Sequence, residues 1–158
     1  MTEPNSRSST SLRIGFHDEP PSQLGRSILE KEIPSDVALV MPLIIRVSDF
    51  LTGEGLLLPD FKGKFQLCLE EALRNAVLHG NRSEFAKKVK LAVFLDDARW
   101  GVRVDDEGSG FRLETVPDPF SDKSIWGEGG RGLHLMSHYM DQVDYFSGGR
   151  VLVMAKCL

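Results

Sequence analysis

The 158-residue chain has few cysteines and no long apolar run, and these shortages exclude several classes of protein. Its two cysteines, Cys68 and Cys157, lie outside the spacings of zinc ligands or redox pairs and within apolar stretches, so we expect buried free thiols. No segment approaches the ~18 apolar residues of a membrane span, and polar residues 1–12 lack the apolar part of a signal peptide. We therefore expect a cytoplasmic protein with no membrane contact.

An excess of positive charge is also lacking. Lys and Arg number 19 against 23 Asp and Glu, which gives a net charge of -4, whereas proteins that grip phosphate backbones carry a basic face. We expect no nucleic-acid partner. Hydrophobic residues nevertheless make up 41% of the chain, as in a globular domain. The Ser- and Pro-rich start predicts a flexible N-terminal extension over residues 1–26, and the folded domain then covers residues 27–158.

Two helices are predicted in the first half of the folded domain. The first follows a strand at residues 27–34, and Pro42 either kinks this helix or marks a late start. The second and clearest helix covers residues 59–81. It has Asp60 available as its N-cap, and Gly80 is placed to end it in a left-handed turn.

Alternating apolar residues predict two antiparallel hairpins. A long loop over residues 112–128 and a helix over residues 132–140 separate them. Short turns between strands mean antiparallel neighbours, so the predicted fold class is α+β. We expect a two-layer α/β sandwich whose mixed, mostly antiparallel sheet carries the helices on one face. The hairpin strands are predicted at residues 88–95, 100–106, 142–146 and 151–158.

Glu71, Asn75 and His79 form a polar stripe on the second predicted helix, because they are spaced i, i+4 and i+8. The stripe borders the apolar arc of that helix. A carboxylate and an amide placed there cost desolvation unless they have partners. The stripe is therefore either a local hydrogen-bond set or part of a site. Glu70 and Arg74 fall on the outer side as a weak surface pair.

Asp106 continues the alternation of the second strand of the first hairpin, so it should point toward the core while Asp105 points outward. An inward carboxylate needs donors. The N6 amino group of adenine is such a donor, whereas guanine presents an acceptor at the same edge. Gly108 and Gly110 would let the backbone approach a flat ligand closely. Taken alone, the pattern also fits a plain turn at the end of a strand.

The stretch GEGGRGLHLM, residues 127–136, has the glycine spacing of a dinucleotide-binding turn. The order of elements argues against that interpretation, because these glycines follow a long loop and precede a helix and an antiparallel hairpin. A glycine-rich turn that enters a helix still presents free N–H groups and partial positive charge to an anion. We expect this turn to bind phosphate.

Read together, EEALRNAVLHGN, VDDEGSGF and GEGGRGLHLM resemble the N box and the two glycine boxes of the GHKL ATPases. The resemblance covers roughly residues 28–158, and within that superfamily the chain is most similar to the anti-sigma-factor serine/threonine kinases. It implies a Bergerat-type fold that binds ATP and Mg²⁺. It further implies that Asn75 coordinates Mg²⁺, that Asp106 accepts from adenine N6 and that Glu71 is the catalytic base.

The resemblance also implies a lid over residues 117–128 and a phosphate turn after it. Anti-sigma kinases usually carry a basic residue ahead of this turn, where the chain has Glu128. Whether Arg131 or Lys123 reaches the γ-phosphate is therefore left open. The cofactor-binding residues that the resemblance implies are Asn75, Asp106, Gly108, Gly110, Gly130, Arg131, Gly132 and Leu133.

The function implied by the resemblance is that of a protein serine/threonine kinase and anti-sigma factor. Such a protein phosphorylates a STAS-domain anti-anti-sigma protein and sequesters a sigma factor or another output protein. Relatives often form a homodimer. Two alternatives stay open: a non-catalytic, ATP-gated binding module, and a histidine-kinase catalytic domain, which is disfavoured because no dimerisation helix with a phospho-accepting His precedes residue 28.

Overall fold

A computed structural model describes residues 14–110 and 130–158 of the chain. Its strands are β1 (Gly15–His17), β2 (Arg26–Pro34), β3 (Lys88–Leu95), β4 (Arg99–Asp105), β5 (Gln142–Phe146) and β6 (Val151–Cys157). Its helices are α1 (Val40–Gly53), α2 (Pro59–Arg74) and α3 (Gly130–Tyr139), and the shorter helical turns are η1 (Val37–Leu39), η2 (Asn75–Gly80) and η5 (Ser147–Gly149).

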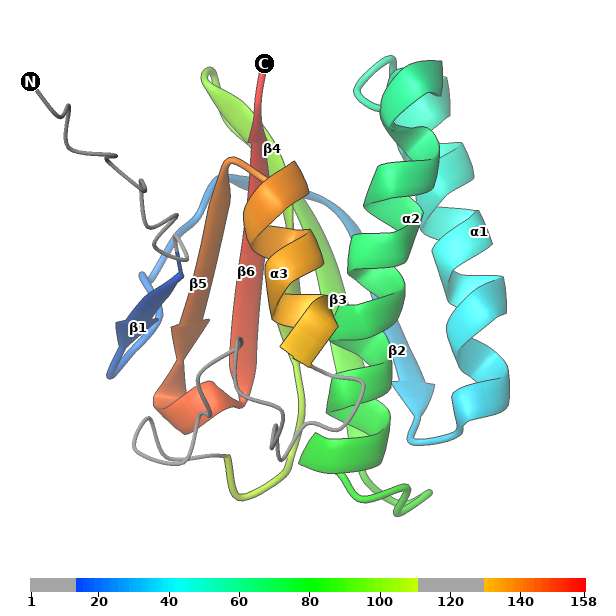
Figure 1. The fold of residues 1–158 in the computed structure, drawn as a ribbon, viewed down its shortest axis with the longest axis vertical. Coiled ribbons are helices and arrows are strands. Elements are labelled where there is room, and N and C mark those ends of the chain that lie inside the picture. Colours follow the sequence, from blue (N-terminus) through cyan, green and yellow to red (C-terminus); the bar gives the residue numbers. More distant parts are fainter. Residues whose placement is uncertain (1–13, 111–129) are drawn as a thin grey trace, which may run out of the picture.

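The three α-helices lie on one face of a six-stranded sheet (Figure 1). The strand order is β1-β5-β6-β4-β3-β2, in which β1 runs parallel to β5 and every other neighbouring pair is antiparallel. Both predicted hairpins are present, as β3–β4 and β5–β6. The predicted α+β class and the mixed, mostly antiparallel sheet are therefore confirmed.

The starts of the helices differ from the sequence prediction in one respect. Pro42 lies in the first turn of α1, where a missing N–H removes no helical hydrogen bond, so it marks a late start rather than a kink. Helix α2 begins at Pro59, and its N-cap is Leu58. Asp60 therefore lies inside the first turn and is not the N-cap, because the preceding proline already occupies the first helical position.

The end of the second helix also differs from the prediction. After Arg74 the chain continues as the π-helical turn η2, and the N–H of Asn81 donates to the carbonyl of Ala76 at 2.8 Å. Gly80 stays within this wide turn and does not adopt a left-handed conformation. The positive φ angles come later, at Arg82 (51°) and Ser83 (56°).

Part of the predicted N-terminal extension belongs to the sheet. Residues 15–17 form β1, which pairs with β5 at the edge of the sheet, so the boundary predicted at residue 26 is too late. From β1 the chain crosses the face of the sheet that the helices leave uncovered (Figure 1). On that face Leu24 packs against a buried cluster that includes Phe94 and Val153. A three-residue strand has no detectable period, and for that reason the sequence does not reveal it.

The main core lies between the helices and the sheet, where Phe65 of α2 meets Trp100 of β4 edge-to-face at 5.2 Å. Cys68 is buried there, and burial raises the pKa of its thiol to about 12. Cys157 is exposed at the end of β6, which corrects the expectation that both thiols are buried. None of the helices in the described ranges combines the length and apolar character that a membrane span requires.

Candidate functional site

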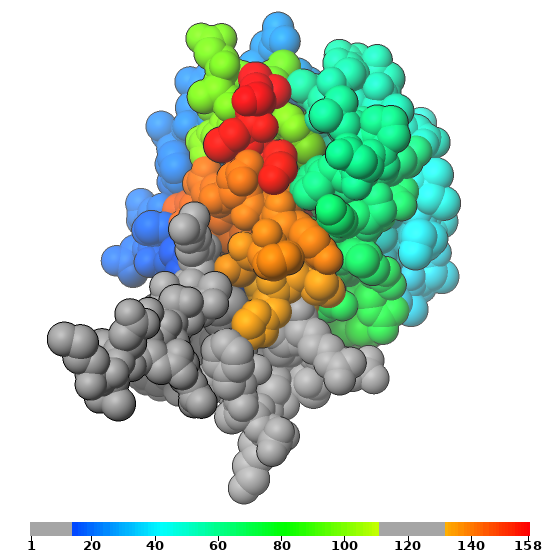
Figure 2. Space-filling view, turned by 45° about the horizontal axis from the view of Figure 1, so that its top comes forward, coloured from blue at the N-terminus to red at the C-terminus, as the bar shows by residue number. Residues whose placement is uncertain are grey.

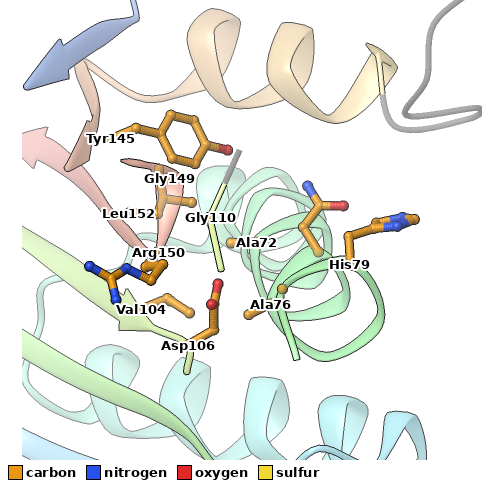
Figure 3. A pocket seen from close by; sticks show the side chains of 12 residues that line it. Ala72, Ala76, His79, Val104, Asp106, Gly110, Tyr145, Gly149, Arg150 and Leu152 are labelled. Atoms are coloured by element: carbon orange, nitrogen blue, oxygen red, sulfur yellow. The ribbon is translucent and has the colours of Figure 1, made fainter. Parts of the chain in front are cut away.

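A pocket opens between the end of α2, the end of β4 and the β5–β6 hairpin (Figure 3). Asp106 and Tyr145 point into it from different sides, and small side chains of α2 and η2 form a further wall. The pocket thus combines an apolar interior with a few polar groups, as ligand sites commonly do. Its lining residues are Ala72, Asn75, Ala76, His79, Gly80, Val104, Asp106, Gly110, Tyr145, Gly149, Arg150 and Leu152.

The polar stripe predicted on the second helix reaches this pocket. Asn75 and His79 line it, and the π-helical turn η2 keeps Gly80 on the same wall. Such wide turns are rare and occur frequently at functional sites. Glu71 does not line the pocket itself but lies half-buried one helical turn earlier, facing the start of α3.

The contact between Glu71 and α3 explains one glycine of the second glycine box. A Cβ added at Gly132 would lie 2.5 Å from Oε2 of Glu71. Only glycine at this position lets the first turn of α3 approach the carboxylate so closely. The packing of α3 beside α2 is visible on the surface of the molecule (Figure 2).

Asp106 follows β4 directly and occupies the position predicted from strand alternation. Its backbone N–H donates to the carbonyl of Arg150 at 2.9 Å, and its carboxylate accepts from the N–H of Gly108 at 2.8 Å. Burial raises the pKa of Asp106 to about 6, although the Gly108 hydrogen bond and the charge of Arg150 oppose this shift. Asp105 points to the opposite face, where Arg103 donates to it at 2.7 Å. The predicted inward and outward directions are confirmed.

The glycines after Asp106 allow close contacts between backbone segments. A Cβ at Gly108 would lie 2.0 Å from the carbonyl oxygen of Gly80, and Gly110 combines a φ of +77° with a Cβ position 2.3 Å from the carbonyl oxygen of Gly148. Gly110 lines the pocket, whereas Gly108 packs behind Asp106 against η2. Their lack of side chains is therefore already required by the protein's own packing.

The predicted phosphate turn is only partly covered by the described residues. Lys123, Glu128 and the expected lid over residues 117–128 lie outside them. Gly130 begins α3, and Gly132 and Arg131 follow in its first turn, although the side chain of Arg131 is again outside the described part. The order α3, β5, β6 with an antiparallel β5–β6 pair is not that of a dinucleotide-binding βαβ unit, which agrees with setting that interpretation aside.

Leu133, the last of the predicted cofactor-binding residues, lies in the first turn of α3. Its side chain is 5% exposed and belongs to the main core. Because this side chain is buried, a nucleotide could contact only the backbone of Leu133. The first N–H groups of a helix have no partner within that helix and can donate to a ligand. Among the described residues, no group of three or more His, Cys, Asp or Glu side chains is arranged to hold a metal ion.

The sequence analysis missed the contribution of the last hairpin to the pocket. Tyr145 of β5 and Leu152 of β6 line it from the sheet, and Gly149 and Arg150 line it from the turn between those strands. Burial raises the pKa of the Tyr145 hydroxyl, and the charges of Asp106 and Glu71 raise it further. No local motif marks these residues. The only available signal was the glycine pair in the turn.

Comparison with known proteins gives relatives from the class that the sequence motifs resemble. Three of them are anti-sigma F factors, from Bacillus thuringiensis (strain Al Hakam), Bacillus mycoides (strain KBAB4) and Bacillus cereus (strain AH187). Each is 32% identical over 81 residues, which are 50% of this chain and 56% of the relative. The chain therefore spans about half the length of the curated relatives it matches.

A family model described as a histidine kinase-like ATPase domain matches residues 33–156. This range runs from the end of β2 to the end of β6 and includes every residue that lines the pocket. The six-stranded sheet with helices on one face is also consistent with that fold. The chain belongs to the family of histidine kinase-like ATPase domains.

Proposed function

We propose that the protein is an ATP-dependent protein serine/threonine kinase that acts as an anti-sigma factor and phosphorylates a STAS-domain antagonist. The observation that carries this proposal is the arrangement of three polar groups. Asn75 and Asp106 line one pocket, and Glu71 lies one helical turn before Asn75 on the side of α3. The family match implies ATP binding, and the similarity to anti-sigma F factors supports the regulatory role.

In this proposal Asp106 identifies the base of the nucleotide. Its carboxylate accepts from the N6 amino group of adenine, and Gly110 lines the same part of the pocket. The phosphates extend past Asn75 toward the start of α3. There the backbone N–H groups of residues 130–133 and the helix dipole favour negative charge.

The side-chain oxygens at the phosphate end are suitable ligands for a hard cation. Mg²⁺ prefers oxygen ligands and is usually held by one or two protein side chains together with substrate phosphates. The carboxamide oxygen of Asn75 is such a ligand, and we assign it to Mg²⁺. When bound, Mg²⁺ neutralises the charge that develops on the phosphate oxygens during transfer.

Glu71 is the proposed catalytic base. The hydroxyl of the substrate serine gives its proton to a Glu71 oxygen as the serine Oγ bonds to the γ-phosphorus. The bond from that phosphorus to the β–γ bridging oxygen breaks, and ADP leaves. Half-burial beside Gly132 fixes the Glu71 carboxylate near the phosphate turn, which a positioned base requires.

The proposed partners are a STAS-domain anti-anti-sigma protein and a sigma factor or another output protein. A second copy of the chain is a further proposed partner. Because a sigma factor and its polymerase act in the cytoplasm, the proposal places this protein there as well. The non-catalytic, ATP-gated binding module remains the alternative, since it requires the same nucleotide pocket without transfer.

Glu71→Gln tests the catalytic assignment. With a serine-containing STAS-domain protein from the same genome as substrate, we expect phosphate transfer to fall about 100- to 10,000-fold. Mg-ATP affinity should stay within about threefold, because the variant keeps the shape and polarity of the side chain. Glu70→Gln, one residue earlier and predicted from the helical period to lie on the outer side of α2, is the matched control and should transfer normally.

Undiminished transfer by the Glu71→Gln variant would contradict the assignment of the base. Wild-type protein that binds Mg-ATP but transfers phosphate to no such substrate would instead favour the binding module. Phosphoamino-acid analysis of the product should give phosphoserine or phosphothreonine. Phosphohistidine would favour a histidine-kinase activity.

A further inference from the structure

Asn81 is a fully buried polar side chain that lies just outside the nucleotide pocket. Its exposed fraction is 0%, and it directly follows the π-helical turn η2. Its Nδ2 donates to Oγ of Ser35 at 2.8 Å and to the carbonyl of Lys88 at 3.0 Å, while its Oδ1 accepts from the N–H of Glu107 at 2.7 Å. The carboxamide thus uses both its donor and its acceptor sides.

These hydrogen bonds join parts of the chain that are distant in sequence. Ser35 follows β2, Lys88 begins β3, and Glu107 follows Asp106 at the end of β4. The network is closed by two more bonds, because Ser35 Oγ donates to the carbonyl of Lys87 at 2.5 Å and Glu107 Oε2 accepts from the N–H of Lys88 at 2.6 Å. Two members hold the loop after Asp106: Asn81 binds the backbone N–H of Glu107, and the N–H of Lys88 binds the Glu107 side chain.

The same loop is confined from the other side by glycine packing. A Cβ at Gly80 would lie 2.4 Å from Oδ2 of Asp106, and a Cβ at Gly108 would lie 2.0 Å from the carbonyl oxygen of Gly80. Residues 106–108 therefore have no room to move toward η2. The Asn81 hydrogen bond to Glu107 prevents the loop from moving away from η2.

We infer that Asn81 is a positioning residue that fixes the Asp106 carboxylate for recognition of the amino group of the nucleobase. This inference rests on the proposed function, in which Asp106 reads adenine. Asn81 does not line the pocket. It acts through Glu107, whose neighbour Asp106 must keep one orientation to select a donor over an acceptor.

The test compares a change in the protein with a change in the ligand. Binding of ATP and of purine riboside triphosphate, which lacks the 6-amino group, is measured for wild type and for Asn81→Ala. Wild type should prefer ATP about tenfold, the effect of one hydrogen bond to a charged acceptor. The variant should prefer ATP less than about threefold, while its affinity for inorganic tripolyphosphate stays within about twofold of wild type.

The control is Val47→Ala, which removes core volume on α1 away from this loop. General destabilisation should not change the preference between the two nucleotides, so this variant should keep the wild-type ratio. A ratio that Asn81→Ala retains in full contradicts the inference alone. Wild type that shows no preference contradicts the proposed function, and with it the inference.

A milder variant covers the case in which Asn81→Ala does not fold. Ser35→Ala removes only the hydroxyl that orients the Asn81 carboxamide. We expect it to reduce the ATP preference about two- to threefold and to speed hydrogen exchange of the Glu107 amide in the nucleotide-free protein. A wild-type ratio together with wild-type exchange at Glu107 would overturn the inference.

Discussion

The end of the pocket at Asp106, where we propose that the nucleobase binds, is here called the base end. Asp106 is held there from both sides, by the close approach of Gly80 and by the hydrogen bond from Glu107 to Asn81. At the phosphate end Asn75 and Glu71 project from one continuous helical segment, and the described part of the facing wall is the first turn of α3. The Asp106 carboxylate is therefore held in place before a ligand arrives. At the phosphate end, the roles that we propose for the Asn75 and Glu71 oxygens depend on the metal ion and the phosphates of a bound nucleotide.

This difference implies a division of labour. Preformed hydrogen bonds at the base end should control affinity and the choice of nucleotide, because they cost no reorganisation on binding. The Asn75 and Glu71 oxygens at the phosphate end should control metal binding and phosphate transfer. Their proposed roles depend on the charged phosphates of the nucleotide and on the charge that develops during transfer. Substitutions at the two ends are thus expected to give different signatures.

The largest effect is expected from Gly108→Ala at the base end. The added Cβ would meet the Gly80 carbonyl oxygen, a backbone atom that cannot rotate aside, so the loop that carries Asp106 must shift. We expect ATP affinity to fall on the order of 100-fold and stability to fall by about 1–3 kcal/mol. Calorimetric titration and urea unfolding measure the two quantities. Unchanged ATP affinity would show that the base end is not rigid.

Asn75→Ala should distinguish the phosphate end. We expect Mg-ATP affinity to fall roughly 30-fold, the effect of losing a polar contact with a charged partner. In excess EDTA the variant and wild type should bind ATP alike, because the lost group is the proposed metal ligand. Arg74→Ala, at the adjacent exposed position, is the control and should keep the magnesium dependence. An equal loss of affinity with and without Mg²⁺ would contradict the assignment.

Asp106→Asn should weaken ATP binding less than Asn75→Ala does. Unlike Gly108→Ala, it should stabilise the nucleotide-free protein near neutral pH. ATP affinity should fall about tenfold, because the amide is a weaker acceptor than the carboxylate. The pKa of Asp106 in the folded protein is about 6, above the ordinary value of 3.8, because burial disfavours its charged form. The folded chain thus binds this proton more tightly than the unfolded chain, and stability decreases as pH rises from about 4 to about 6.

Asparagine removes that titration. Nucleotide-free Asp106→Asn should therefore melt at a higher temperature than wild type at pH 7.5, and the difference should shrink toward pH 4. Thermal unfolding at the two pH values measures it. A melting difference that is the same at both values would contradict the burial argument for Asp106.

Gly63→Ala gives the smallest effect and lies outside both ends of the pocket. Gly63 is an exposed position within α2, and an added Cβ there meets nothing within 4 Å. Alanine should raise stability by about 0.5–1 kcal/mol, because glycine costs conformational entropy in a helix. Urea unfolding measures the gain, and ATP affinity should not change. A loss of stability would contradict the claim that Gly63 has room for a side chain whereas Gly108 does not.

The base end was largely predictable because its signals are local. Strand alternation placed Asp106 on the pocket side. At the phosphate end, i, i+4 spacing likewise placed Asn75 on the helical stripe that reaches the pocket. Helix and hairpin periods are likewise properties of short windows. The wrong assignments of Asp60 and Gly80 concern helix ends, where Pro59 and the π-helical turn change the local geometry.

Tertiary contacts could not be predicted in the same way. Tyr145 is one of several apolar residues in an alternating strand, and only the pairing of β5 with β6 and β6 with β4 brings it to Asp106. Asn81 sits after a helix, where an exposed cap would be the ordinary expectation. Its burial depends on β2, β3 and the loop after β4 meeting at one place, which no short window contains.

Equilibrium titration of the wild-type chain with Mg-ATP and with Mg-GTP tests the central claim most directly. If the pocket is a nucleotide site in which Asp106 recognises the base, one equivalent of Mg-ATP binds. Mg-GTP then binds at least about tenfold more weakly than Mg-ATP, because guanine presents an acceptor to the carboxylate. Equal affinity for the two nucleotides, or binding of neither, would contradict the account.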